Sequence, residues 1–309
     1  MSYHGLEVID FHVHLPVWRA PAPKPTPTQL YAAERRRQWR REWDFPEPED
    51  SSGYTDEEMT ARWAAEVDKY GLSRVVLVTG GGNHHLAELI APHRDKLVGL
   101  AHHDLAGPNP AEELARAVEE DGLKGYKVIA PALKLDSFDG PQLEPVWKYL
   151  EEHQLPLLIH FGWLGTGGGV IQHPLIDPLS IVGVATRHPA LNIVVAHFGA
   201  GYFGELLQLC WSFPNIYADT SGSNQWMRWM PYRLELEDLF RKTYETIGPG
   251  RIVFGTDSSW FPRGFSVRYL QDQIRACRYV GMRDDDLALI FGGNAARLLH
   301  LEGAVGKGK

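Results

Sequence analysis

Residues 74–79 read Arg-Val-Val-Leu-Val-Thr, a short run in which successive side chains are apolar on both faces of an extended chain. Strands of this kind belong to parallel sheets that are covered by helices on both sides. Similar runs recur along the chain, at 97–101, 125–130, 156–161, 192–197, 216–219 and 251–256. Each run is followed by a stretch of helical periodicity, roughly at 84–93, 110–121, 141–153, 176–188, 201–211, 234–247 and 266–281. This alternation predicts an α/β protein built from β/α units.

The opening run, residues 6–11, brings the number of β/α units to eight. Eight units in a chain of 309 residues favour a closed (β/α)₈ barrel, or TIM barrel, over an open doubly wound sheet. No Gly-x-Gly-x-x-Gly pattern opens a helix after the first run, which argues against a dinucleotide-binding fold. We therefore expect a single barrel domain over residues 1–309, with an irregular insertion at 16–53 after the first strand.

The insertion is predicted to be irregular because its beginning is rich in proline. The stretch 21–27, Pro-Ala-Pro-Lys-Pro-Thr-Pro, cannot continue a helix or a central strand. The charged segment that follows, between 34 and 42, indicates a short exposed helix with its arginines in solvent. From Thr55 the pattern turns helical, with Thr55 as the N-cap and Glu58 three residues further on.

Composition places the chain among ordinary globular proteins and narrows its partners. Hydrophobic residues make up 44% and charged residues 23% of the chain. A net charge of −8 and a sequence pI near 6.0 argue against binding to nucleic acid or to an anionic membrane. With no long apolar run and no signal-peptide pattern, we expect a cytoplasmic protein. Cys210 and Cys277 are then expected to be buried, reduced thiols.

Side chains suited to metal binding gather at the ends of the predicted strands. Residues i and i+2 of a strand share a face, so His12 and His14 can converge on one point as ligands for zinc or a similar metal. Asp10 lies one step deeper on that face, where it could orient one of them. Later strands end in further residues of this kind: Lys127 (fourth), His160 (fifth), His197 (sixth) and Asp257 (eighth). Since barrel active sites lie at the C-terminal strand ends, this set predicts a metal-dependent site there.

These motifs resemble those of the amidohydrolase superfamily, in the amidohydrolase-related branch that includes aminocarboxymuconate-semialdehyde decarboxylase. The matching positions span the chain: Asp10-Phe11-His12-Val13-His14, His160, His197, Gly255-Thr256-Asp257 and the closing Gly292-Gly293-Asn294-Ala295-Ala296-Arg297-Leu298-Leu299. The PHP phosphoesterases also open with a D-x-H-x-H pattern, but they lack this ending and usually carry more late histidines.

The resemblance implies a ligand set and a catalytic pair. His12, His14, His160 and Asp257 would hold one divalent metal ion, with zinc as the expected ion, and would leave a position open for water or substrate. His197 would be the acid or base, and Asp257 could share the proton of the water. In some branches a lysine at the position of Lys127 is carboxylated and bridges two ions, so a second ion is expected only with that modification. Otherwise Lys127 is an active-site cation or a salt-bridged barrel lysine.

The substrate side is predicted from the loops after the strands. The glycine-rich loop 161–169 could be a lid, could cradle an anion, or could simply be flexible. The candidates for substrate contact are Lys127, Trp163, Arg228, Arg233 and Arg263, because tryptophan and cationic side chains together suit an aromatic or conjugated acid. His102 and His103 follow the third strand, so one of them points inward, but neither is expected on the metal.

Three functions remain open from the sequence. The main expectation is a metal-dependent hydrolase, in which metal-bound water attacks an ester, lactone or amide carbonyl of a small, carboxylate-bearing substrate. The alternative is a metal-dependent, non-oxidative decarboxylase of a small aromatic or unsaturated acid. The third is a binding protein that keeps the metal without turnover. A homodimer is an expectation from the family resemblance, with no nucleic-acid or membrane partner.

Overall fold

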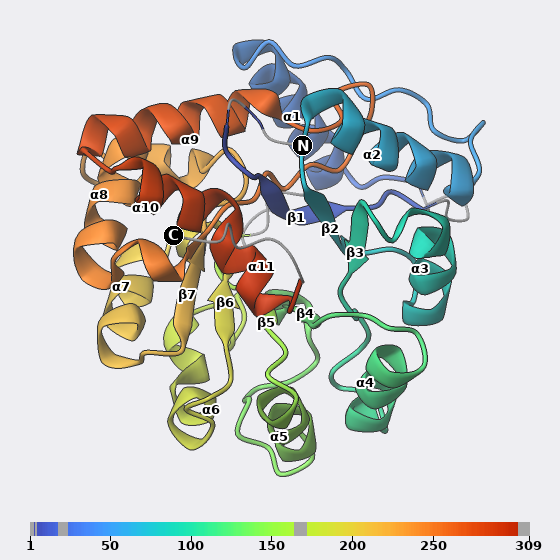
Figure 1. Cartoon of the computed structure of the whole chain (residues 1–309), viewed down its shortest axis with the longest axis vertical. Coiled ribbons are helices and arrows are strands. Elements are labelled where there is room, and N and C mark those ends of the chain that lie inside the picture. Colours follow the sequence, from blue (N-terminus) through green and yellow to red (C-terminus); the bar gives the residue numbers. More distant parts are fainter. Residues whose placement is uncertain (1–2, 4, 18–23, 164–171, 302–309) are drawn as a thin grey trace.

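The computed structural model describes residues 3, 5–17, 24–163 and 172–301, and it confirms the predicted alternation of strands and helices (Figure 1). The strands are β1 (Ile9–His14), β2 (Arg74–Thr79), β3 (Leu97–Gly99), β4 (Tyr126–Ile129), β5 (Leu157–His160), β6 (Ile193–Val195), β7 (Ile216–Asp219) and β8 (Ile252–Val253). Each lies within one of the predicted apolar runs, or, for β1, continues that run through both histidines.

All strand pairs are parallel, and the strands follow one another in chain order. Regular ladders join β1-β2-β3 and β4-β5-β6-β7-β8. Single parallel bridges span the two junctions between these sheets, one from Ala101 to Tyr126 and one from Val13 to Ser258. At the second junction Phe11 N–H donates to the Phe254 carbonyl at 3.0 Å. The strands therefore run around a ring, which is the arrangement of the predicted (β/α)₈ barrel.

Helices surround this ring, as Figure 1 shows. They are α2 (Asp56–Tyr70), α3 (Asn83–Ile90), α4 (Pro110–Glu119), α5 (Glu144–Glu152), α6 (Val182–Arg187), α7 (Phe203–Ser212), α8 (Leu236–Ile247) and α9 (Val267–Val280). The predicted start of α2 is confirmed, because Thr55 and Glu58 form a capping box in which each side chain accepts the other's backbone N–H.

The insertion is more regular than the sequence indicated. A helix, α1 (Pro27–Glu42), begins seven residues before the charged segment and has 16 residues. Proline was interpreted there as a helix breaker, but Pro27 occupies the first helical turn, where no backbone N–H bond is lost. Thr26 caps the helix together with Gln29. No residue of α1 is buried, so the exposed arginine-rich helix is as expected and only its length was wrong.

Two hydrophobic cores stabilise the barrel. One lies between the strands and the surrounding helices and includes Trp63 and Trp147, both fully buried. The other fills the barrel, where Phe11, Leu158 and Val194 pack against the C-terminal helix α11 (Asn294–Leu298). The elements before α11 are α10 (Asp284–Ala288) and a π-helical turn at Leu289–Gly293. Apolar packing thus closes the barrel at the N-terminal ends of its strands. Polar side chains lie at the opposite, C-terminal ends.

The closing motif found in the sequence has a structural role. Asn294 is fully buried, and its side-chain amide donates to the backbone carbonyls of Pro249 and Ile252, both at 2.7 Å. This ties α11 to the start of β8. Cys210 and Cys277 are buried free thiols, as predicted. No helix in the described part of the chain is long and apolar enough to cross a membrane.

Candidate active site

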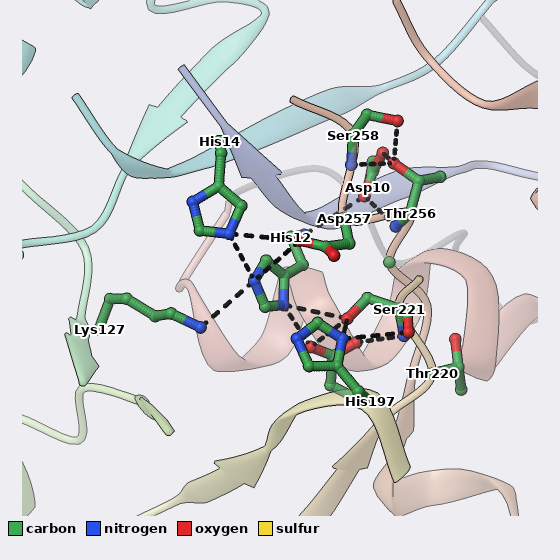
Figure 2. Close-up of polar contacts among 12 residues, drawn as sticks. Asp10, His12, His14, Lys127, His197, Thr220, Ser221, Thr256, Asp257 and Ser258 are labelled. Carbon is green, nitrogen blue, oxygen red and sulfur yellow. Dashed lines mark hydrogen bonds and ion pairs between the residues drawn. The ribbon is translucent and has the colours of Figure 1, made fainter. Parts of the chain in front are cut away.

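Three of the predicted ligands meet at the C-terminal ends of β1 and β8 (Figure 2). His12 Nε2 lies 3.3 Å from His14 Nε2, and His14 Nε2 lies 3.3 Å from Asp257 Oδ1. The third side of this triangle, from His12 Nε2 to Asp257 Oδ1, is 3.9 Å. Among the described residues this is the one group of three such side chains whose ligand atoms all lie within 4.8 Å of one another.

The spacing of this group fits a divalent ion. Ligand atoms about 2.0–2.1 Å from a tetrahedral zinc ion lie about 3.3–3.4 Å from one another. Two of the three separations have this value, and the donor set of two imidazoles and a carboxylate suits zinc and related metals. Two imidazole nitrogens and a carboxylate oxygen thus converge as the ligand atoms of a bound divalent ion would. These residues therefore fit a metal ion.

His12 is oriented by a residue that the sequence analysis did not single out. Asp219, the last residue of β7, places Oδ2 2.7 Å from His12 Nδ1. Both side chains are fully buried. A carboxylate on Nδ1 holds the proton there and leaves Nε2 free as a ligand. Asp219 satisfies the rule that selected the other candidates, which is a side chain able to bind metal at the end of a predicted strand. Its strand was predicted at 216–219, so the sequence alone could have identified it.

The sequence suggested that Asp10 orients one of the histidine rings, but the structure shows a different role. Its Oδ1 accepts from the backbone N–H of Thr256 at 2.9 Å and from that of His12 at 3.3 Å, and its Oδ2 accepts from the Thr256 hydroxyl. The pairing of β1 with β2 is irregular between Asp10 and Val13, which turns the carboxylate away from the histidine rings. Asp10 thus joins β1 to the segment after β8. Burial raises its pKa to about 7, against the opposing effect of the Thr256 hydrogen bonds.

Two further contacts fix the trio. His14 Nδ1 lies 2.9 Å from the hydroxyl of Thr79, the last residue of β2. The backbone N–H of Asp257 donates to the carbonyl of His12 at 2.8 Å. Burial raises the pKa of the Asp257 carboxyl, but the hydrogen bond from His14 and the charges of His197 and His14 outweigh it, so the pKa is below its usual range. Asp257 is therefore held as an ionised ligand.

His197 lies beside the trio, with its ring centroid 4.9 Å from that of His12. It has φ +57 in the 3₁₀ turn Ala196–Gly199 that follows β6. Its Nδ1 is 3.1 Å from the backbone carbonyl of Ser221 and 2.8 Å from the Ser221 hydroxyl. A carbonyl can only accept, so Nδ1 carries a proton and Nε2 is the nitrogen left to exchange one. The Ser221 hydroxyl also lies 3.1 Å from His12 Nδ1, so it contacts both rings.

His160, the fourth predicted ligand, lies next to His197 instead of in the trio. Their ring centroids are 4.8 Å apart, and His160 Nε2 is 3.3 Å from the backbone oxygen of Trp163. Burial lowers the pKa of His160 well below its usual value, as do the nearby His197 and Lys127. A neutral imidazole is the form that binds metals. Its place as a ligand stays a prediction.

Lys127 points into the site from β4 and is 1% exposed. Its Nζ lies 3.3 Å from His12 Nε2 (Figure 2). Burial lowers the pKa of Lys127 to about 8, while the charges of Asp219 and Asp257 oppose that shift. This position agrees with an active-site cation. Of the two histidines after β3, His102 places Nδ1 3.0 Å from the Lys127 carbonyl.

The arginines predicted to meet substrate differ in position. Arg263 is 8% exposed and stacks on Trp260, with Cζ 3.4 Å from the ring centroid. Its Nε and Nη2 have no hydrogen-bond partner among the described residues. Burial lowers its pKa, against the charges of Tyr269 and Asp257. Arg228 and Arg233 lie further out: Arg228 pairs with Glu42 of α1 at 3.3 Å and Arg233 with Glu235 at 2.9 Å.

The predicted glycine-rich loop falls mainly on residues 164–169, which lie outside the described residues. Trp163, at its beginning, packs its indole against Trp229, with the ring centroids 5.3 Å apart. Its backbone N–H donates to the Ala200 carbonyl at 3.0 Å. Trp163 thus lies beside the turn that carries His197.

A parallel β/α barrel with histidines and a carboxylate at its C-terminal strand ends defines a class of metal-site barrel enzymes. Within that class the chain belongs to the amidohydrolase family, whose model matches residues 9–301.

Two curated relatives are similar to this chain over most of its length. The gamma-resorcylate decarboxylase of Rhizobium sp. (strain MTP-10005) is 24% identical over 274 residues, covering 75% of this chain and 78% of that protein. The protein of the same name from Rhizobium radiobacter is 23% identical over 273 residues, covering 74% and 78%.

Solved structures show the same fold. The 5-carboxyvanillate decarboxylase of Sphingomonas paucimobilis has a TM-score of 0.63 at 20% identity, covering 96% of this chain and 99% of that one. An amidohydrolase from Burkholderia multivorans with bound zinc has a TM-score of 0.62 at 16% identity, covering 96% and 99%. A probable 2-pyrone-4,6-dicarboxylic acid hydrolase from Acinetobacter baumannii has a TM-score of 0.58 at 15% identity, covering 96% and 100%.

Proposed function

We propose that this protein is a metal-dependent decarboxylase of a small, hydroxylated aromatic acid. The observation that carries the proposal is that both curated relatives, each matched over about three quarters of this chain, are decarboxylases of one such acid. The main expectation from the sequence was a hydrolase, and the relatives favour the alternative instead. A barrel of this family with two histidines and an aspartate on one centre is compatible with either reaction.

The metal centre consists of His12, His14 and Asp257, and His160 is proposed as a further ligand. A divalent cation held there would supply positive charge for binding and orienting the anionic oxygens of the substrate. Zinc is our proposed ion, in keeping with the separations between the ligand atoms. Asp219 keeps His12 in the tautomer that presents Nε2 to this centre.

The chemical step replaces a bond from a ring carbon to the carboxylate by a bond from that carbon to hydrogen. A proton must reach the ring carbon, the electron pair of the broken bond stays with the ring, and carbon dioxide leaves. Because Asp257 is held ionised, it serves as a ligand and not as the proton donor. His197 is the proposed donor, since Ser221 anchors its Nδ1 and leaves Nε2 to carry the transferred proton.

Two cations are proposed to bind the negative charge of the substrate. Lys127 lies inside the site, 3.3 Å from His12 Nε2, and would pair with an oxygen of the acid or of its hydroxyl group. Arg263 is buried, and its Nε and Nη2 have no hydrogen-bond partner among the described residues. An arginine that donates to a carboxylate gains strong, charge-assisted hydrogen bonds. Trp163 completes the proposed contacts on the β5 side.

The test is to load the purified protein with zinc or with manganese and incubate it with gamma-resorcylate, with 5-carboxyvanillate and with simple lactones. We expect carbon dioxide and the corresponding phenol from at least one acid, measured by chromatography. His12→Ala should lose bound metal and activity together. His197→Gln should keep the metal and lose about 10²–10⁴-fold in kcat.

His84→Gln, on the exposed surface of α3, is the matched control and should behave as the unaltered protein. Lactone hydrolysis without release of carbon dioxide from any aromatic acid would overturn the decarboxylase proposal and restore the hydrolase.

A further inference from the structure

Two adjoining cavities lie between the end of the insertion and the segment that follows β7. The larger has a volume of about 530 Å³ and the smaller about 170 Å³. They share five wall residues: Trp43, Ser223, Asn224, Met227 and Glu235. Because these five residues line both cavities, the two form one groove, called the β7 pocket below.

The β7 pocket begins next to the metal centre. The Ser221 hydroxyl contacts the rings of His12 and His197, and the next residue, Gly222, lines the smaller cavity. A Cβ atom on Gly222 would lie 3.5 Å from His197 Nδ1 and 3.7 Å from Asp257 Oδ2. The backbone of Gly222 also has φ +84, which favours glycine. Gly222 therefore belongs to the wall of the pocket and also lies beside His197 and Asp257.

The charged side chains of the pocket are neutralised within the protein. Each arginine of its wall faces an acidic partner: Arg228 with Glu42, Arg233 with Glu235 and Arg275 with Glu237. Asp272 lies 3.9 Å from Arg268. A second carboxylate on the substrate would have to displace one of these pairs. The charge balance therefore favours an uncharged occupant.

The rest of the wall combines aromatic and apolar side chains with polar ones such as Ser223 and Gln225. Trp43, Met227, Met230, Tyr232 and Leu234 line the larger cavity. The indole of Trp43 is held in place by stacking on Phe45 at 5.8 Å and by the edge of Tyr269 at 5.4 Å. Methionines adapt to irregular apolar groups and contact aromatic rings favourably. The amide of Asn224 is already occupied, because it donates to the Thr220 carbonyl and accepts from the Trp226 indole.

We propose that the β7 pocket binds an uncharged aromatic extension of the substrate, so that the natural substrate is an aromatic acid larger than a single ring. The inference rests on the proposed function for the position of the reacting carboxylate. A volume of about 530 Å³ lies within the range that holds drug-sized ligands. The insertion then has a role in specificity, since it contributes Trp43 to the wall.

Two measurements test the pocket. In the first, the metal-loaded protein decarboxylates 2-hydroxybenzoate and its 4-phenyl derivative, and the ratio of the two kcat/KM values is compared between variants. The ratio is kcat/KM for the phenyl derivative divided by kcat/KM for 2-hydroxybenzoate. Met227→Trp fills the pocket and Trp43→Ala removes its aromatic wall, and each variant should lower this ratio about tenfold. Trp211→Ala, at an exposed tryptophan of α7, is the matched control and should leave the ratio unchanged.

In the second measurement, calorimetry gives the affinities for phenol and for 3-phenylphenol, which carry no carboxylate and need no turnover. We expect 3-phenylphenol to bind at least tenfold more tightly, with that advantage lost in Trp43→Ala. This result supports the pocket even if no acid is decarboxylated, in which case the proposed function alone fails. Equal affinities for both phenols, or a ratio of kcat/KM values that neither variant changes, would overturn the inference.

Discussion

Replacing Asp219 by asparagine tests how the barrel prepares His12 for its ligand role. Asp219 Oδ1 accepts from the backbone N–H of Ser221 at 2.7 Å, and Oδ2 accepts from the Ser221 hydroxyl at 2.9 Å and faces His12 Nδ1 at 2.7 Å. In Asp219→Asn one oxygen can still accept from the Ser221 backbone. The new amide nitrogen then faces His12 Nδ1, and since it can only donate, Nδ1 must accept. The imidazole proton moves to Nε2, the nitrogen that faces His14 and Asp257.

The expected cost follows from this tautomer change. A residue that hydrogen-bonds the non-ligating nitrogen of a metal-binding histidine typically contributes 10–100-fold to metal affinity. That factor corresponds to about 1.4–2.7 kcal/mol. We expect the upper part of the range, because Asp219 and His12 are both fully buried and water cannot replace the lost acceptor.

The assay is competition between the protein and a chelator of known affinity, with zinc and with manganese, followed by thermal unfolding of each metal-free variant. Asp95→Asn, at an exposed aspartate in the loop before β3, removes the same charge away from the strand ends and should bind metal like the unaltered protein. If Asp219→Asn binds both ions within twofold of the unaltered protein, while His12→Ala does not bind them, the tautomer argument is refuted.

Three further outcomes follow from contacts described above. Thr55→Ala should lower the free energy of unfolding by about 1 kcal/mol in chemical denaturation, whereas Thr26→Ala should leave it unchanged, because α2 is packed on the barrel and α1 has no buried residue. Asn294→Ala should cost about 2–4 kcal/mol in the same measurement, since the buried carbonyl of Ile252 and the partly buried carbonyl of Pro249 lose their donor. In metal-free protein, Asp10 with its raised pKa stabilises the fold below pH 4 and loses that contribution as the pH rises to about 7. The unfolding free energy of the unaltered protein, taken relative to Asp10→Asn, should therefore fall by about 4 kcal/mol across this interval in urea titrations, and a flat difference would contradict the raised pKa.

The strands were predictable because burial on both faces leaves a direct trace in the sequence. Runs such as 74–79 and 156–161 stay apolar at consecutive positions, and each contains the strand that the structure shows. Helix α1 left no such trace, because it buries no residue. Its place is determined at its end instead, where Trp43 and Phe45 pack on Tyr269, more than 200 positions later in the chain. Contacts at that separation have no local signature.

The site was predictable to the extent that it follows strand ends. His12, His14 and Asp257 come together as that rule requires. The rule also applied to Asp219, which was overlooked because an aspartate at a strand end is common without a function. Asp10 shows the opposite limit: strict alternation placed it with the histidines, but the irregular pairing of β1 directs it to Thr256. Such an irregularity depends on the neighbouring strands and is not encoded in the period of one strand.

The metal-ligand set does not distinguish hydrolysis from decarboxylation. Both reactions use a cation and a nearby histidine, so the motifs that identify the family serve either. What separates them is whether a proton is removed from water or delivered to carbon, and His197 is the proposed group for either transfer. In the structure its Nδ1 is anchored by Ser221, which follows β7, and the adjoining Gly222 lines the β7 pocket. A histidine anchored on one nitrogen exchanges a proton through the other, and the proposed decarboxylation needs that proton delivered to a ring carbon. This arrangement joins residues that follow β6 and β7, which no single motif contains.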